Sequence, residues 1–139
     1  MAAINLQKII SVKGQPGLFN LINYNPKGYF LQSFEGGPIR FFSNEKGKVL
    51  AIGNVDLKLE NNQSMNLLDV FRVIEKEGEP HPNISGDHLQ AYFHRIIPKL
   101  DRSVALSHLQ KVVGWYGKIG ELFKEIEMIN EEVDGLTII

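Results

Sequence analysis

The chain has 139 residues, of which 43% are hydrophobic and 22% are charged, and its formal net charge is −1. These values are typical of one ordinary globular domain, or two small ones, with enough apolar side chains for a core. The absence of cysteine excludes disulfides, thiolate metal sites and a cysteine nucleophile. The apolar runs are too short for a signal peptide or a membrane span, so we expect a cytoplasmic protein with no membrane partner.

Charge is distributed unevenly along the chain. Residues 1–60 carry seven Lys or Arg and four Asp or Glu, whereas residues 61–139 carry eight and twelve. A positive bias in the first part favours an anionic partner. It is nevertheless much weaker than the basic footprint of a typical nucleic-acid-binding domain.

The first 60 residues predict a small antiparallel β structure. Short apolar or alternating runs are separated by turns rich in Gly, Pro and Asn, at a spacing of roughly ten residues. This pattern is typical of a strongly bent sheet or barrel. The expected strands are residues 17–24, 29–34, 39–42, 49–53 and 55–59.

Residues 13–22, "KGQPGLFNLI", raise the question of a phosphate-binding loop. Such a loop needs G-x-x-x-x-G-K-[ST] between a strand and a helix. Here Gly14 and Gly17 are three residues apart, no Lys-Ser or Lys-Thr follows, and an expected strand comes next. We therefore expect Gly14, Pro16 and Gly17 to be structural residues of a turn that leads into the strand.

After residue 64 the apolar residues recur with the period of an α-helix. We expect three or four helices, and Gly114, Gly117 and Gly120 predict a kink or break in the longest. Pro98 ends the middle helix, because a residue before proline avoids the α conformation. The expected helices are residues 65–78 capped by Ser64, 86–97 capped by Ser85, and 108–132 capped by Ser107.

No arrangement of residues in the sequence predicts catalysis, a metal or a cofactor. The four histidines lack the i, i+3 or i, i+4 spacing of helical metal ligands. No motif supplies a nucleophile with its base, so we expect a non-enzymatic protein. A hydrolase-like enzyme with an unrecognised site is a lesser alternative. We expect Asp101, Arg102 and Ser107 to be structural.

Aromatic residues are frequent in the expected sheet and lie beside basic ones. Exposed aromatic rings next to cations could stack bases or hold a peptide. Ordinary core packing is the simpler interpretation, because a half-buried strand needs one apolar face. The candidate partner-binding residues are Tyr24, Lys27, Tyr29, Arg40 and Phe42.

Two features of the long helix bear on packing and on nucleic-acid recognition. We expect Trp115 and Tyr116 to be structural, as core residues or as a bridge between two regions. The helix pair 86–97 and 108–116 is similar to a helix-turn-helix, but the start of its second helix has one Lys and no Arg to reach bases or phosphates.

The last stretch, residues 121–139, is expected to be a helix or a tail. It combines an apolar stripe with several acidic residues. If the stripe has no partner within the chain, it is a self-association surface that would make a homo-oligomer. The residues of the stripe are Leu122, Phe123, Ile126 and Ile129.

Four segments together resemble a small uncharacterised bacterial family, a domain of unknown function. They are "SVKGQPGLFNLI" at 11–22, "GYFLQSF" at 28–34, "AYFHRIIPKLDR" at 91–102 and "SHLQKVVGWY" at 107–116. The sequence departs from the family at His108, where an acidic residue is usual, and in the tail. The resemblance implies an SH3-like barrel followed by a helical subdomain. It implies no activity.

We therefore expect an α+β protein: a small SH3-like antiparallel β-barrel over residues 1–60, then a three- to four-helix subdomain over 61–120, with 121–139 as the C-terminal helix or tail. We expect it to be a binding or adaptor protein that acts through protein–protein contacts. Binding of RNA or single-stranded nucleic acid by the weakly basic aromatic barrel is the alternative.

Overall fold

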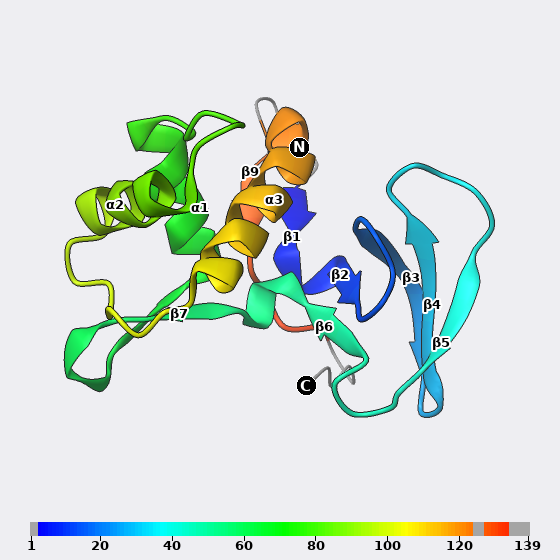
Figure 1. The fold of residues 1–139 in the computed structure, drawn as a ribbon. Coiled ribbons are helices and arrows are strands. Elements are labelled where there is room, and N and C mark those ends of the chain that lie inside the picture. The colour runs from blue at the N-terminus through cyan, green and yellow to red at the C-terminus, as the bar shows by residue number, and fades with distance from the viewer. Residues whose placement is uncertain (1–2, 124–126, 134–139) are drawn as a thin grey trace. The chain divides into compact units, whose positions relative to one another are not determined.

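The computed structural model describes residues 3–123 and 127–133, except for the side chains of residues 121–123 (Figure 1). It confirms a mixed α+β protein with mainly antiparallel sheets. The chain divides into two compact units. Unit 2 is residues 56–120, and unit 1 comprises residues up to Val55 together with the described residues from Glu121 onward. Unit 2 is therefore an insertion in the sequence of unit 1.

Unit 1 contains a five-stranded antiparallel sheet with the order β5-β4-β3-β2-β6. Four of its strands were expected. The fifth strand, β2, was not expected. The expected strand 55–59 is not part of this sheet, because it pairs with another strand within unit 2. The strands are β2 (Ile9–Val12), β3 (Phe19–Asn25), β4 (Gly28–Ser33), β5 (Arg40–Ser43) and β6 (Val49–Ala51).

The sheet is open. Strands β5 and β6 are its two edges and do not pair with each other within the described residues, so the predicted closed barrel is not confirmed. One face of the sheet carries the core, in which Phe19 and Phe42 meet edge to face with ring centroids 5.6 Å apart. The buried core residues are Ile10, Val12, Phe19, Tyr29, Leu31, Phe42, Val49 and Ala51.

The turn between β2 and β3 contains the glycines of "KGQPGLFNLI". Gly14 and Gly17 have φ of 81° and 76°, a left-handed conformation that favours glycine. The N–H of Gln15 donates to the carbonyl of Val12 at 3.0 Å, and the N–H of Lys13 donates to the carbonyl of Lys48 at 2.8 Å. The turn therefore redirects the chain from β2 into β3, and Pro16 lies exposed within it.

The two ends of unit 1 are joined by a second, parallel sheet of β1 (Ala3–Asn5) and β9 (Glu127–Ile129). The predicted helix over 108–132 is therefore wrong at residues 127–129, which form β9, whereas α3 is described up to Phe123. Helical spacing of apolar residues did not reveal that residues 127–129 pair with a strand at the other end of the chain. Residue Ile126 lies outside the described residues, and Ile129 is a half-buried strand residue.

A group of polar contacts holds this end of unit 1 together. It links the 3₁₀ turns η1 (Leu6–Lys8) and η2 (Ile52–Asn54) to the residue after β9. The amide of Asn130 donates to the carbonyl of Gly53 at 2.8 Å, and its Oδ1 accepts from Nε2 of Gln7 at 2.8 Å. Asn5 and the backbone of Glu131 exchange two further hydrogen bonds, of 3.0 and 3.1 Å. We call the residues Asn5, Gln7, Gly53, Asn130 and Glu131 the polar clamp.

Unit 2 begins with a hairpin of β7 (Asp56–Lys58) and β8 (Ser64–Asn66), connected through the 3₁₀ turn η3 (Glu60–Asn62), and continues with three α-helices among its described residues. The helices are α1 (Leu67–Glu77), α2 (Gly86–Ile96) and α3 (Leu106–Phe123). Gly114, Gly117 and Gly120 do not interrupt α3. No helix in the described part of the chain is long and apolar enough to cross a membrane.

Two of the three predicted helix caps are wrong. Ser64 is in β8, and Asn66 caps α1 instead by accepting from the N–H of Leu68, because the hairpin extends further than the sequence suggested. Ser107 is the second residue of α3, since this helix begins at Leu106. Ser85 does cap α2: its hydroxyl accepts from the N–H of His88 at 3.3 Å. Helix α2 ends before Pro98, as predicted, although its last residue is Ile96 rather than the expected Ile97, which is the C-cap.

The apolar faces of the three helices form the core of unit 2. Phe71 of α1 and Tyr116 of α3 meet edge to face, with ring centroids 5.4 Å apart. Tyr116 is buried, whereas Trp115 is only half-buried, so Tyr116 is the main aromatic core residue of α3. The hydroxyl of Tyr92 in α2 donates to the carbonyl of Gly78 at the end of α1, at 2.6 Å.

Two glycine-to-alanine variants test the packing, one at a position with no room for a Cβ and one at a position with open space around it. A Cβ at Gly53 would lie 2.9 Å from the backbone carbon of Leu6, whereas a Cβ at Gly117 meets nothing within 4 Å in the described structure. We expect Gly53→Ala to lower the free energy of unfolding by about 1–3 kcal/mol through overpacking. Gly117→Ala should raise it by about 1 kcal/mol through helix propensity. Urea unfolding midpoints measure both, and shifts in the same direction would contradict the described packing.

Stability should fall at high pH because of Tyr92. Burial raises the pKa of Tyr92 to about 12, opposed in part by the nearby charge of Arg95. A folded-state pKa above the unfolded value stabilises the protein below about pH 10, and this contribution is lost as the pH rises through the folded pKa. Tyr92→Phe should therefore flatten the alkaline fall in the free energy of unfolding. An unchanged slope would show that Tyr92 ionises as freely in the folded chain as in the unfolded one. Some slope should persist, because burial also raises the pKa values of Tyr29 and Tyr116.

Candidate functional site

Two of the five candidate partner-binding residues belong to the core of unit 1. Tyr29 and Phe42 lie directly opposite each other on β4 and β5, and their exposed fractions are 7% and 6%. Tyr24 is half-buried and packs against the same core. The rings of Tyr29 and Phe42 are therefore not presented to a partner, and core packing, the simpler interpretation of the aromatic residues, accounts for them.

The other two candidates, Lys27 and Arg40, lie at opposite ends of β5. Arg40 begins the strand, and its guanidinium carbon lies 4.9 Å from the centroid of the Phe42 ring, a cation–π contact. Its Nη1 also donates to Oε1 of Gln15 at 3.4 Å. Lys27 lies in the turn between β3 and β4, and its carbonyl accepts from the N–H of Asn44, directly after β5. The five candidates therefore do not form one exposed surface.

A different set of apolar side chains is exposed. The large hydrophobic residues with the highest exposure in the described chain are Ile39 at 51%, and Phe41 and Ile22 at 47% each. Ile22 is the extra residue of a bulge in β3, between Leu21 and Asn23. Phe41 alternates with Phe42, so its ring is on the face opposite the core, edge to face with that of Phe30 at 5.1 Å. We call Phe30, Ile39 and Phe41, with the backbone of β5, the β5 surface.

Sequence reasoning missed this surface because Phe41 and Phe42 are adjacent and equally apolar. Which of the two points inward is decided by the register that places Phe42 opposite Tyr29. A strand in which polar and apolar residues alternate shows from its sequence which side chains point inward. The segment "IRFF" at 39–42 has no such alternation, so its sequence does not distinguish the inward ring from the outward one.

The electrostatics of the sheet favour an acidic partner. Residues 3–55 include six Lys or Arg and only two Asp or Glu. Three of the basic residues lie near the ends of β5. Arg40 is its first residue, Lys27 is in the turn beside its last residue, and Lys46 is in the loop after it. Positive charge therefore brackets the exposed edge strand.

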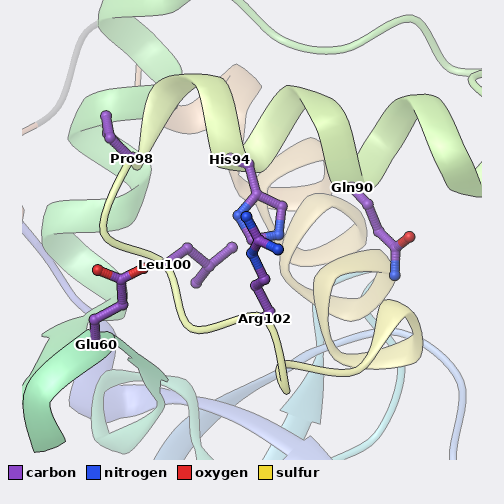
Figure 2. Close-up of a pocket in the computed structure, with 6 residues that line it drawn as sticks. All are labelled: Glu60, Gln90, His94, Pro98, Leu100 and Arg102. Atoms are coloured by element: carbon purple, nitrogen blue, oxygen red, sulfur yellow. The ribbon is translucent and has the colours of Figure 1, made fainter.

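Unit 2 contains a second candidate site, a polar pocket of about 410 Å³ (Figure 2). Helix α2 supplies Gln90 and His94, and the chain after α2 supplies Pro98, Leu100 and Arg102, while Glu60 comes from the connection between β7 and β8. The pocket exists because residues 58–60 pair with 99–101. The N–H of Glu60 donates to the carbonyl of Lys99 at 2.8 Å, and the N–H of Asp101 donates to that of Lys58 at 3.0 Å.

Asp101 holds the turn from which Arg102 projects. Its carboxylate accepts from the hydroxyl of Ser103 and, at 2.8 Å, from the N–H of Ser103. These hydrogen bonds lower the pKa of Asp101 below its usual value. The structure thus places Asp101 in the backbone turn and Arg102 in the pocket, where the sequence suggested structural roles for both.

Metal chemistry receives no support from the described residues, in which no three His, Cys, Asp or Glu are grouped to hold an ion. The predicted self-association stripe falls largely outside the description. Nothing is described of the side chains of Leu122 and Phe123 or of residue Ile126.

Comparison with known proteins identifies a shared fold. No protein-family model matches the sequence, and no curated protein matches it. The solution NMR structure of a protein from Bacteroides vulgatus is similar, with a TM-score of 0.64 and 21% sequence identity, over 92% of this chain and 98% of that one. At this identity the likeness shows the fold alone.

The opposite placement of adjacent rings gives a direct test. Phe42→Ala should lower the free energy of unfolding by about 3–5 kcal/mol, because it leaves a cavity among buried side chains. Phe41→Ala removes a ring that is 47% exposed and should cost less than about 1 kcal/mol. Thermal unfolding of both variants measures the difference, and equal losses would show that the register of β5 is not the one described.

Proposed function

We propose that the protein is a non-enzymatic binding protein, and that its partner is a protein that adds an extended acidic segment along β5. The observation that carries this proposal is an edge strand with exposed apolar side chains between basic residues. Edge strands offer unpaired N–H and C=O groups, and many domains bind a peptide by adding it as a further strand.

The described contacts favour this partner over single-stranded nucleic acid. Base stacking needs exposed aromatic faces. Tyr29 and Phe42 are buried, and Phe41 is already in edge contact with Phe30. Alternate side chains of an added strand, in contrast, would lie beside Phe41 of β5 and Ile39, the exposed residue directly before this strand. The NMR titration described below also tests the binding of RNA.

We further propose that unit 1 is SH3-like, in the bacterial family that the sequence motifs resemble. Two features support this. The last strand of the sheet, β6, returns beside the first, β2, and the Arg40–Gln15 contact spans from β5 to the turn after β2. A chain without cysteine suits the reducing cytoplasm, where we place the protein.

A peptide titration followed by NMR tests the strand-addition proposal. The probe is a short peptide of alternating glutamate and valine, with a lysine–valine peptide and oligouridylate as comparisons. We expect the acidic peptide to shift the amide signals of Arg40–Ser43. Ile39→Thr with Phe41→Thr should weaken its binding at least about fivefold, since each exposed apolar contact contributes roughly 1 kcal/mol. Ile22→Thr, two strands away from the edge, is the matched control and should bind normally.

Four outcomes would overturn the proposal. The acidic peptide leaves β5 unchanged, the lysine peptide binds equally well, or oligouridylate binds with an affinity that falls steeply with salt while the peptide does not bind. Shifts in β5 that grow with protein concentration in the absence of peptide would show that a second copy of the chain occupies this edge, and would also overturn it.

A further inference from the structure

The polar pocket of unit 2 has the chemistry of a ligand site that is separate from the β5 surface. Its volume of about 410 Å³ is within the range of small-molecule pockets. Leu100, which is 1% exposed, provides an apolar floor. Around it stand a carboxylate from Glu60, an amide from Gln90, an imidazole from His94 and a guanidinium from Arg102.

These polar groups line one space, although Glu60 and Arg102 are exposed residues at its sides. Gln90 and His94 are four residues apart in α2 and therefore lie on the same face of the helix. Figure 2 shows the Arg102 side chain rising from the loop toward His94, with Leu100 between Arg102 and Glu60. The pocket thus has a donor side, made by α2 and Arg102, and an acceptor side, made by Glu60.

None of these four polar side chains takes part in an ion pair or hydrogen bond with another described residue. The neighbouring Arg95 differs: its Nη1 lies 3.9 Å from Oε2 of Glu77, and its guanidinium carbon lies 5.5 Å from the centroid of the Tyr92 ring. The backbone beneath Arg102 is nevertheless held, by the pairing of 58–60 with 99–101 and by the Asp101–Ser103 turn. Arg102 therefore has no ion-pair or hydrogen-bond partner among the described residues, and a guanidinium on a held backbone beside a half-buried histidine is suited to bidentate binding of a carboxylate.

We propose that this pocket binds a small zwitterion, with the carboxylate of the ligand at Arg102, His94 and Gln90 and its ammonium group at Glu60. A simple anion satisfies only the donor side and meets the negative charge of Glu60. A ligand with separated opposite charges satisfies both sides, and its methylene chain lies over Leu100.

Three probes of similar length separate these contributions: 4-aminobutyrate, butyrate and butylamine, titrated into the full chain and followed by NMR at the pocket residues. We expect 4-aminobutyrate to bind about threefold or more tightly than either of the others, as partly exposed ion pairs allow. Glu60→Gln should remove the advantage over butyrate. Arg102→Gln should weaken the binding of both carboxylates about threefold or more, and Arg102→Lys should restore part of it, because the charge returns without the planar fork.

Lys99→Gln is the matched control, because it removes a positive charge from the same segment at an exposed residue that does not line the pocket. Its binding should equal that of the parent protein. Equal affinity for all three probes, weakening by Lys99→Gln as large as by Arg102→Gln, or no shifts at the pocket would each overturn the proposal. Inorganic phosphate binding more tightly than 4-aminobutyrate, in a manner that depends on Arg102, would also overturn it, since the ligand would then be a phosphate.

Discussion

Asn130 joins the two ends of unit 1, and the arrangement of the described chain depends on this contact. Its amide nitrogen donates to the carbonyl of Gly53 and its Oδ1 accepts from Gln7. Only glycine fits at position 53, because a Cβ there would meet both of these side chains and the backbone of Leu6. The polar clamp brings residues that follow unit 2 in the sequence back to the first strand, so unit 1 is made of two segments that flank unit 2 in the sequence.

The clamp also makes the two edges of the large sheet unequal. Strand β6 continues directly into η2, which belongs to the clamped end. Strand β5 has no such continuation. Arg40 and Gln15 meet over its inner face. Phe41 on its outer face, and Ile39 directly before the strand, are exposed. One uncovered edge with basic residues around it is the physical basis of the proposed protein binding.

Local signals predicted much of the fold. Turn residues separated β3, β4 and β5, and Ser85 with Pro98 bounded α2, because caps and prolines act over a few residues. Contacts between distant residues were not predictable: the pairing of β1 with β9, or of residues 58–60 with 99–101, leaves no periodic signal. Both candidate sites were missed for the same reason, because each depends on contacts between residues that are distant in the sequence. The exposure of Phe41 depends on strand register, and Glu60 and Arg102 come to line the same pocket only through the pairing of Leu59 with Leu100.

Native-state hydrogen exchange of the full chain tests the central claim, that unit 1 is fastened at the polar clamp and open at β5. The account predicts that the amides that β1 and β9 donate to each other exchange as slowly as those of β2, β3 and β4, because they open only when unit 1 unfolds. Alternate amides of Arg40–Ser43, which point away from β4, should exchange far faster. Fast exchange in β1 and β9, or full protection along both sides of β5, would contradict it.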